Sequence, residues 1–85
     1  MNGLEKLQNE QDQILRWPKK NFERVLILDF LISKFDANRT YHELEINEII
    51  KQWHTFQDWS GLRRELIVRG YMNHNTDGTE YHRLS

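Results

Sequence analysis

The chain of 85 residues contains no cysteine, a single proline and only four glycines. Without cysteine it forms neither a disulfide framework nor a cysteine-ligated zinc site. It also lacks an apolar run approaching the ~20 residues of a membrane-spanning helix, and its N-terminus lacks the charged and apolar regions of a secretory signal. We therefore expect one soluble cytoplasmic domain, not associated with a membrane, that is long enough to form a modest core without metal or disulfide support.

Positive charge is not in excess either. Lys and Arg together number 12 against 13 Asp and Glu, so the formal net charge is -1. A protein dedicated to nucleic-acid binding is more often basic, and this balance counts against DNA binding. Acidic residues predominate between positions 36 and 58, whereas positions 60 to 85 are mildly positive. An anionic partner should therefore contact the C-terminal part of the chain.

Residues 1–16 are mostly polar, with four apolar side chains at loosely helical spacing, Leu4, Leu7, Ile14 and Leu15. Too few apolar positions repeat for a coiled coil. We predict that 1–16 is a polar or amphipathic N-terminal extension, frayed or docked on the surface as a short helix, and that 17–85 is the compact domain. The alternative is that the extension is an arm that binds a protein partner or forms a homodimer.

The compact domain is predicted to begin with two helices. The first follows Pro18, because proline suits the first helical position, and runs from Lys19 to about Phe35. Its nearly continuous apolar residues are typical of a helix buried on most sides. Thr40 and Glu43 fit a capping box that opens a second helix, which continues to about position 54.

A third helix is predicted between an N-cap at Asp58 and a left-handed C-cap at Gly70. The short connection between the second and third helices makes a helix-turn-helix plausible. After the third helix, Asp77-Gly78 indicates a β-hairpin with a type I′ turn, because both residues tolerate the positive φ that this turn needs.

The hairpin completes a recognisable element order. With Thr76 opposite Thr79, Met72 and Tyr81 lie on one face of the hairpin, where they can cover the core. Three helices followed by a hairpin predict an α+β, mainly helical fold of the winged-helix type, with the hairpin as the wing. Thr40-Tyr41 is expected to add the short strand that such domains often place between the first two helices.

Several motifs, in order, resemble a known family. They are Pro-Lys-Lys at 18–20, Tyr41-x-Glu43-x-Glu45-Ile46-Asn47, Asp58 four residues before Leu62-Arg63-Arg64-x-Leu66, Gly70, and Asp77-Gly78-x-x-Tyr81. Over about residues 16–84 the chain is similar to the uncharacterised bacterial family called domain of unknown function 2087. The resemblance implies a winged-helix-like domain of a kind often found in chains that look like transcription regulators.

Arg63 and Arg64 are predicted to point in different directions, because successive residues of an α-helix are about 100° apart. Arg63 falls within the apolar arc of the third helix, where a guanidinium needs a carboxylate partner. Glu45 is the favoured partner, with Glu48 and Asp29 as alternatives. We therefore predict a structural ion pair between Arg63 and Glu45.

Arg64 points away from that arc, beside Ser60 and Val68. If the third helix enters a major groove, these three side chains face base edges or phosphates, and Gly61 permits close approach. The alternative is that Arg64 is an ordinary solvated surface residue. Lysines at the start of the first helix and polar residues of the wing suit phosphate contacts. The candidate nucleic-acid-binding residues are Lys19, Lys20, Ser60, Gly61, Arg64, Val68, His74, Thr76 and Arg83.

Catalytic and metal-binding patterns are lacking. His42 and His54 are too far apart on the second helix to converge, and His74 with His82 lacks a third ligand. No nucleophile elbow or glycine-rich phosphate loop occurs. We expect no enzyme, no metal and no cofactor. The leading hypothesis is a winged-helix module that binds double-stranded DNA in a small transcription regulator; the alternative is a protein–protein interaction module on the same scaffold without nucleic-acid binding.

Overall fold

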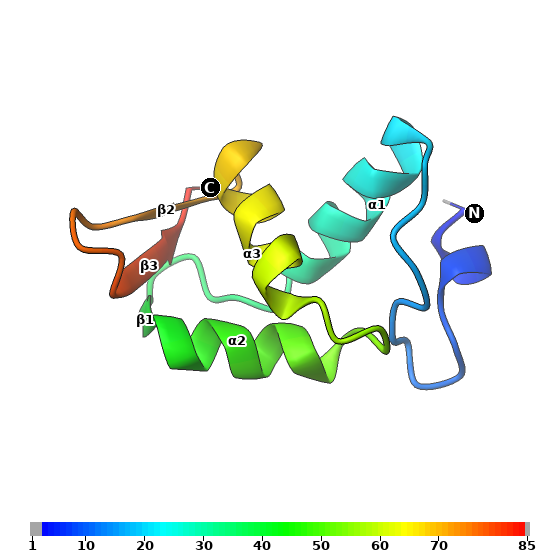
Figure 1. The fold of residues 1–85 in the computed structure, drawn as a ribbon, viewed down its shortest axis with the longest axis horizontal. Helices are drawn as coiled ribbons and strands as arrows, with labels where there is room; N and C mark the ends of the chain where they lie inside the picture. The colour runs from blue at the N-terminus through cyan, green and yellow to red at the C-terminus, as the bar shows by residue number, and fades with distance from the viewer. Residues whose placement is uncertain (1–2, 85) are drawn as a thin grey trace.

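The computed structural model describes residues 3–84. In this range the elements (Figure 1) are the 3₁₀ helix η1 Leu4–Leu7, α1 Asn21–Ile32, β1 Thr40–His42, α2 Glu43–Gln52, α3 Trp59–Val68, β2 Met72–His74 and β3 Glu80–Arg83. The strands form an antiparallel sheet in the order β1-β3-β2. The chain is therefore a small α+β domain. None of the helices within residues 3–84 is long and apolar enough to cross a membrane.

The molecule is elongated, with extents of 36 × 22 × 20 Å. In Figure 1 the sheet and the tip of the β2–β3 hairpin lie at one end, and the N-terminal segment with the start of α1 lies at the other. Buried apolar residues from every element form the core between these ends. They include Leu7, Ile14, Ile27, Leu28, Leu31, Ile46, Ile50, Leu62, Leu66, Met72 and Tyr81.

The sheet confirms the predicted strand pairing. β1 forms at Thr40-Tyr41 as expected and pairs with β3. In the hairpin Met72 is opposite Arg83, which is the predicted register, and both Met72 and Tyr81 are buried. The alternation of apolar and polar residues sets this register, because a shift by one residue would turn Met72 and Tyr81 to solvent.

The hairpin turn differs from the predicted type I′ turn. Gly78 has a φ of +72°, but Asp77 is not among the residues with positive φ. The Asn75 carbonyl accepts the Gly78 N–H at 3.1 Å, and the Asn75 side chain accepts the Thr79 N–H at 3.0 Å. Because these bonds close a longer loop that starts at Asn75, the loop requires a left-handed conformation only at Gly78.

α1 is shorter and more exposed than predicted. It starts after an N-cap at Lys20, and Pro18 is buried ahead of the helix, where its carbonyl accepts a hydrogen bond from Arg24 Nε at 2.6 Å. One face of α1 packs on the core, whereas Phe22 is 61% exposed. The expectation of a helix buried on most sides is therefore wrong, because the surrounding elements cover one face only.

The caps of α2 and α3 show where local patterns identify helix ends. The capping box predicted at Thr40 and Glu43 lies too early, because Thr40 pairs in β1; the N-cap is His42, whose N–H donates to Glu45 Oε1 at 3.0 Å. For α3 the predictions are confirmed. Asp58 is the N-cap, and Gly70 has a φ of +83° just after the helix.

The N-terminal segment is part of the fold. It is helical only in η1, and Leu4, Leu7 and Ile14 are buried in the common core. The Ile14 N–H donates to the Trp53 carbonyl at 2.8 Å, and the Thr55 N–H donates to the Ile14 carbonyl at 2.9 Å. The segment before α1 is thus hydrogen-bonded to the turn between α2 and α3.

Candidate functional site

α3 presents one polar side to solvent. Leu62 and Leu66 are 1% and 0% exposed, whereas Ser60, Arg64 and Val68 are exposed, Val68 by 73%. The burial pattern follows from the helical period, which places Arg64 about 160° from Leu66. These three exposed side chains are the ones predicted to face a nucleic acid.

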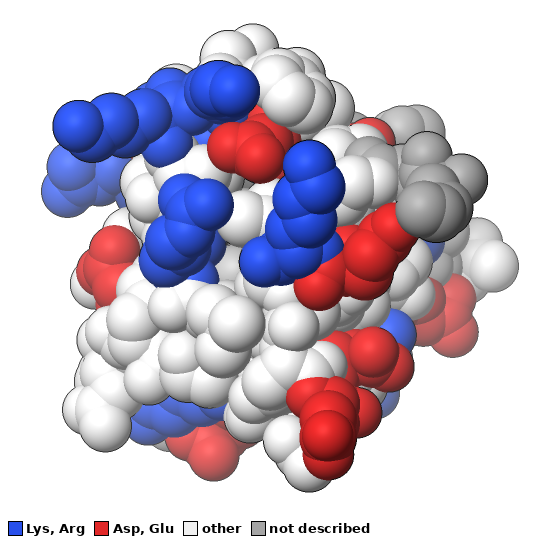
Figure 2. All heavy atoms as spheres, turned by 90° about the vertical axis from the view of Figure 1, so that its right-hand side faces the viewer, with Lys and Arg blue, Asp and Glu red and all other residues white. Residues whose placement is uncertain are grey.

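A basic segment lies next to this side of α3. Lys19 and Lys20 are exposed directly before α1, and the neighbouring Trp17 lines a hollow of about 130 Å³ together with Arg64. The Arg24 guanidinium lies 5.3 Å from the centre of the Trp17 ring. Figure 2 shows Lys and Arg gathered on the upper part of the face near the start of α1, and acidic side chains on its right and lower parts.

Gly61 has a structural reason to be glycine. Asp58 Oδ1 accepts the Gly61 N–H at 3.3 Å, so the N-cap carboxylate lies against this position. A Cβ on Gly61 would lie 2.4 Å from Asp58 Oδ2. The cap of α3, rather than an approaching ligand, therefore accounts for this glycine.

Arg83 does not reach from the wing toward solvent as predicted. Its NH1 group donates to the carbonyl of Ile32, the last residue of α1, at 3.4 Å and to the Phe35 carbonyl just beyond the helix at 3.0 Å. Carbonyls at the C-terminal end of a helix lack N–H partners within the helix and can accept such bonds. Arg83 therefore holds β3 against the C-terminal end of α1.

The remaining wing candidates lie on an acidic tip. His74 and Thr76 are exposed, and His74 Nδ1 is 2.7 Å from the Asn75 carbonyl oxygen. Hydrogen bonds from the Thr79 side chain and N–H lower the pKa of Asp77, which keeps its carboxylate ionised. From position 75 to 80 the chain carries acidic residues but no Lys or Arg, so the tip offers phosphates no cation.

The predicted ion pair of Arg63 forms with a different acid. Arg63 NH2 lies 3.3 Å from Glu43 Oε1, and Arg63 NH1 donates to Asn47 Oδ1 at 2.5 Å. Glu43 and Asn47 are one helical turn apart and so lie on the same side of α2. Arg63 is thus a tie between α2 and α3, as expected, but the assignment to Glu45 is wrong.

Glu45 is held elsewhere by its place in the first turn of α2. Its carboxylate turns back to the His42 N–H and forms an ion pair with Arg39. The hydrogen bond from His42 is the largest cause lowering the pKa of Glu45, and the charge of Arg39 acts in the same direction. A carboxylate that caps its own helix cannot also reach α3.

His54 has a role that the sequence did not reveal. It is 4% exposed, its Nδ1 lies 2.7 Å from the Ile50 carbonyl oxygen, and its Nε2 accepts the Asp58 N–H at 2.9 Å. This pattern requires a neutral ring with the proton on Nδ1. His54 therefore connects the end of α2 to the N-cap of α3. Its position four residues before an N-cap was the only available signal.

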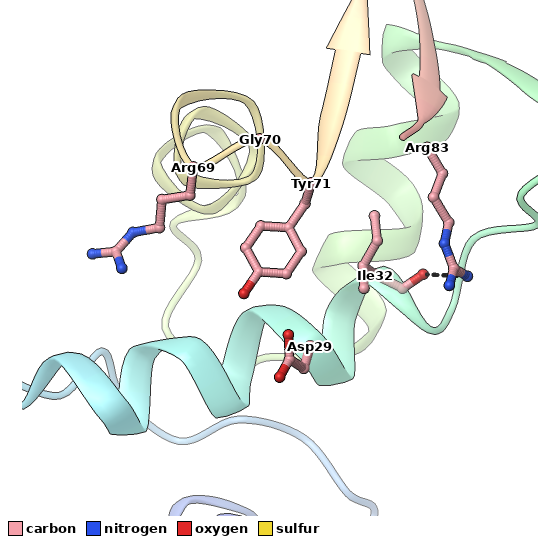
Figure 3. Close-up of a pocket in the computed structure, with 6 residues that line it drawn as sticks. All are labelled: Asp29, Ile32, Arg69, Gly70, Tyr71 and Arg83. Carbon is pink, nitrogen blue, oxygen red and sulfur yellow. Dashed lines mark hydrogen bonds between the residues drawn. The ribbon is translucent and has the colours of Figure 1, made fainter. Parts of the chain in front are cut away.

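A second hollow, of about 450 Å³, lies at the other end of α3 (Figure 3). Its lining residues come from α1, from the chain directly after α3 and from β3; they are Asp29, Ile32, Arg69, Gly70, Tyr71 and Arg83. Burial raises the pKa of Tyr71, and the neighbouring Asp29 carboxylate raises it further. Sequence reasoning missed this hollow, because its residues belong to three separate elements.

The fold and these surfaces define a small α+β domain in which a short turn joins two helices that pack against α1 and a three-stranded sheet. The chain belongs to the family named "Uncharacterized protein conserved in bacteria (DUF2087)", whose model matches residues 13–83. This match confirms the resemblance found in the sequence. The matched residues include Ile14, which pairs with His54 in the α2–α3 turn. No curated protein and no solved structure matches the chain.

Proposed function

We propose that this chain is a winged-helix module that binds double-stranded DNA within a bacterial transcription regulator. The order α1, β1, α2, α3, β2, β3, with β1 beside β3, supports the winged-helix assignment. The α2–α3 pair then corresponds to the helix-turn-helix. In such domains the second helix of the pair enters the major groove, which is wide enough for an α-helix.

The position of Arg64 is the observation that carries the proposal. Arg64 projects from the exposed side of α3 beside the segment that holds Lys19 and Lys20. Ser60 and Val68 flank it on the same side of the helix and can contact base edges. In this arrangement the lysines bind phosphates and fix the orientation of the protein, while α3 contacts the bases.

The acidic hairpin tip changes the predicted interface. Asp77 and Glu80 would face phosphates unfavourably, and Arg83 is directed toward the end of α1. We therefore limit the proposed DNA-binding face to α3 and the segment before α1. His74 and Thr76 remain exposed at the hairpin but lack a cation beside them, so they are secondary candidates.

DNA affinity at several salt concentrations tests this proposal. The chain should bind a mixed-sequence duplex at low salt, and Arg64→Ala should weaken binding by about 1–3 kcal/mol if Arg64 contacts a base, or reduce the salt slope by about 1 if it contacts a phosphate. Arg39→Ala is the matched control, because it removes one positive charge from the loop before β1. Fluorescence anisotropy gives both quantities. Absence of binding at low salt, or equal losses in both variants, contradicts the proposal.

A protein-interaction module is the second candidate, supported by the outer side of α2. Leu44 is 77% exposed there and lines a hollow of about 360 Å³ with the partly exposed Ile49. Exposed apolar patches of this kind occur at protein interfaces. The residues 1–16 are less suited to this role, since Leu4, Leu7 and Ile14 are buried in the chain's own core. A stable complex that Leu44→Asp abolishes, together with no DNA affinity, would favour this candidate.

A further inference from the structure

Leu44 lies between two hollows on the outer side of α2. The first, of about 360 Å³, is the one that it shares with Ile49. The second, of about 260 Å³, lies toward the hairpin and is lined also by His42, Glu43 and Thr79. Leu44 is 77% exposed, so most of its side chain is open to contact with another molecule. This side of α2 therefore offers both apolar surface and space for an apolar side chain.

The surface around Leu44 has an excess of negative charge. Each glutamate that lines the two hollows has an ion-pair partner; they are Glu43, Glu45 and Glu48. By contrast, none of the ion pairs formed among residues 3–84 includes Asp77 or Glu80. Both lie within two positions of Thr79 and so adjoin the second hollow. A molecule that docks on Leu44 is therefore favoured if it carries positive charge.

The start of α1 has the complementary features. Phe22 is 61% exposed, and the Lys20 ammonium lies 6.0 Å from the centre of its ring. Lys19 is exposed as well, and none of the ion pairs formed among residues 3–84 includes either lysine. Residues 13–22 contain no Asp or Glu. This part of the chain therefore presents an aromatic ring next to uncompensated positive charge.

The two surfaces lie at opposite ends of the molecule. In Figure 1 the start of α2 adjoins the sheet, whereas the start of α1 lies toward the other end of the long axis. A single copy therefore cannot bring its own Phe22 to its own Leu44, but two copies can bring Phe22 of one against Leu44 of the other. Contact between two like ends would instead place two acidic or two basic surfaces together, which is electrostatically unfavourable.

We propose that the chain associates head to tail with a second copy of itself. The Phe22 ring of one copy packs against Leu44 of the next, and the lysines before α1 approach the acidic hairpin tip. Because the contact joins two different surfaces, every added copy leaves one of each free, and association continues into longer chains. A single aromatic ring buries only about 150–250 Å², so the association is weak and requires a high protein concentration.

This proposal rests on the Leu44 surface of the second candidate function and does not require DNA binding. Lys19 and Lys20 belong both to the docking surface and to the proposed DNA-binding face. One copy therefore cannot use these two lysines for both contacts at the same time.

Sedimentation equilibrium of the full chain, between about 10 µM and 1 mM at low salt, measures the association constant. The average mass should rise with concentration, and it should fall on addition of salt, because salt screens contacts between exposed charges. Phe22→Ser and Leu44→Ser should each lower the association constant at least about tenfold, since each removes one half of the apolar contact. Leu84→Ser is the matched control, because Leu84 is 46% exposed and lies directly after β3, outside both surfaces.

A mixture of the two variants distinguishes a head-to-tail contact from other forms of association. The Phe22→Ser chain keeps Leu44, and the Leu44→Ser chain keeps Phe22, so equal amounts of both should form a dimer that does not grow further. Both replaced side chains are exposed, and the core is left intact.

Four results would overturn the proposal: a chain that stays monomeric, a mixture that does not associate, an effect of only one of the two variants, or an equal effect of Leu84→Ser. If a chain that stays monomeric binds a different protein through Leu44, this inference fails while the second candidate function is supported. The two are thus distinguishable.

Discussion

At the scale of single residues, Arg63 and Arg64 show how one helical step separates two environments. The Arg63 side chain is 21% exposed and contacts Glu43 and Asn47, whereas Arg64, about 100° further around the helix, is exposed. The helical period predicted this division. It did not predict the partner of Arg63, because the choice between Glu43 and Glu45 depends on the cap that Glu45 makes with its own helix.

Replacing each arginine by alanine tests whether Arg63 stabilises the fold and Arg64 does not. Arg63→Ala should lower the free energy of unfolding by roughly 1–2 kcal/mol, because it leaves the Glu43 and Asn47 side chains without their partner on α3. Arg64→Ala should change the free energy by less than about 0.5 kcal/mol, as an exposed substitution does. Urea unfolding followed by circular dichroism gives both values. Equal losses would show that Arg63 does not tie α2 to α3.

Also at the residue scale, Glu45 makes the stability of the fold depend on pH. Its pKa in the folded state lies below the ordinary value of 4.5, because the His42 N–H and the Arg39 charge favour the carboxylate. A carboxylate whose pKa is lower in the folded state than in the unfolded state stabilises the fold at pH values above its ordinary pKa. This stabilisation is lost as the pH falls through the pKa of the folded state. An NMR titration of the Glu45 side-chain carboxyl should therefore give a midpoint below 4.5, and Arg39→Ala should move it upward. A midpoint at or above 4.5 would contradict the cap.

At the scale of elements, the caps of α3 and the hairpin register followed from short patterns, whereas the position of the N-terminal segment did not. Asp58, Gly70 and the alternation around Tyr81 each act within a few residues of the element that they define. Residues 3–16 instead pair through backbone groups with a turn far along the chain, and backbone hydrogen bonds leave no side-chain pattern. The four apolar residues of this segment, at only loosely helical spacing, could not indicate the contact.

The packing of this segment predicts an unequal effect of two neighbouring substitutions. Ile14→Ala should lower the free energy of unfolding by about 3 kcal/mol, because Ile14 is fully buried and its removal leaves a cavity beside the α2–α3 turn. Leu15→Ala is the control, since Leu15 is 43% exposed and its replacement should lower the free energy of unfolding only slightly. Thermal unfolding of both variants compares them. Similar melting temperatures would mean that the segment is not part of the cooperative core.

At the scale of the whole molecule, the two ends of the long axis differ in charge. The face near the start of α1 carries gathered basic side chains together with acidic ones, whereas the hairpin tip at the other end carries Asp77 and Glu80 but no Lys or Arg from position 75 to 80. The fold class and element order were predictable, because they depend on periodicity and turn residues. The direction of Arg83 and the hollow beside Tyr71 were not, since both depend on how α1 lies relative to the sheet.

The contact of Ile14 with the α2–α3 turn also bears on the order of folding. The Thr55 side chain contacts the Ile14 carbonyl across 41 positions of sequence, so this contact forms only after a long loop has closed. Closing such a loop costs chain entropy that local helix formation does not. The contact between the N-terminal segment and the α2–α3 turn should therefore form late in folding, after the helices have formed.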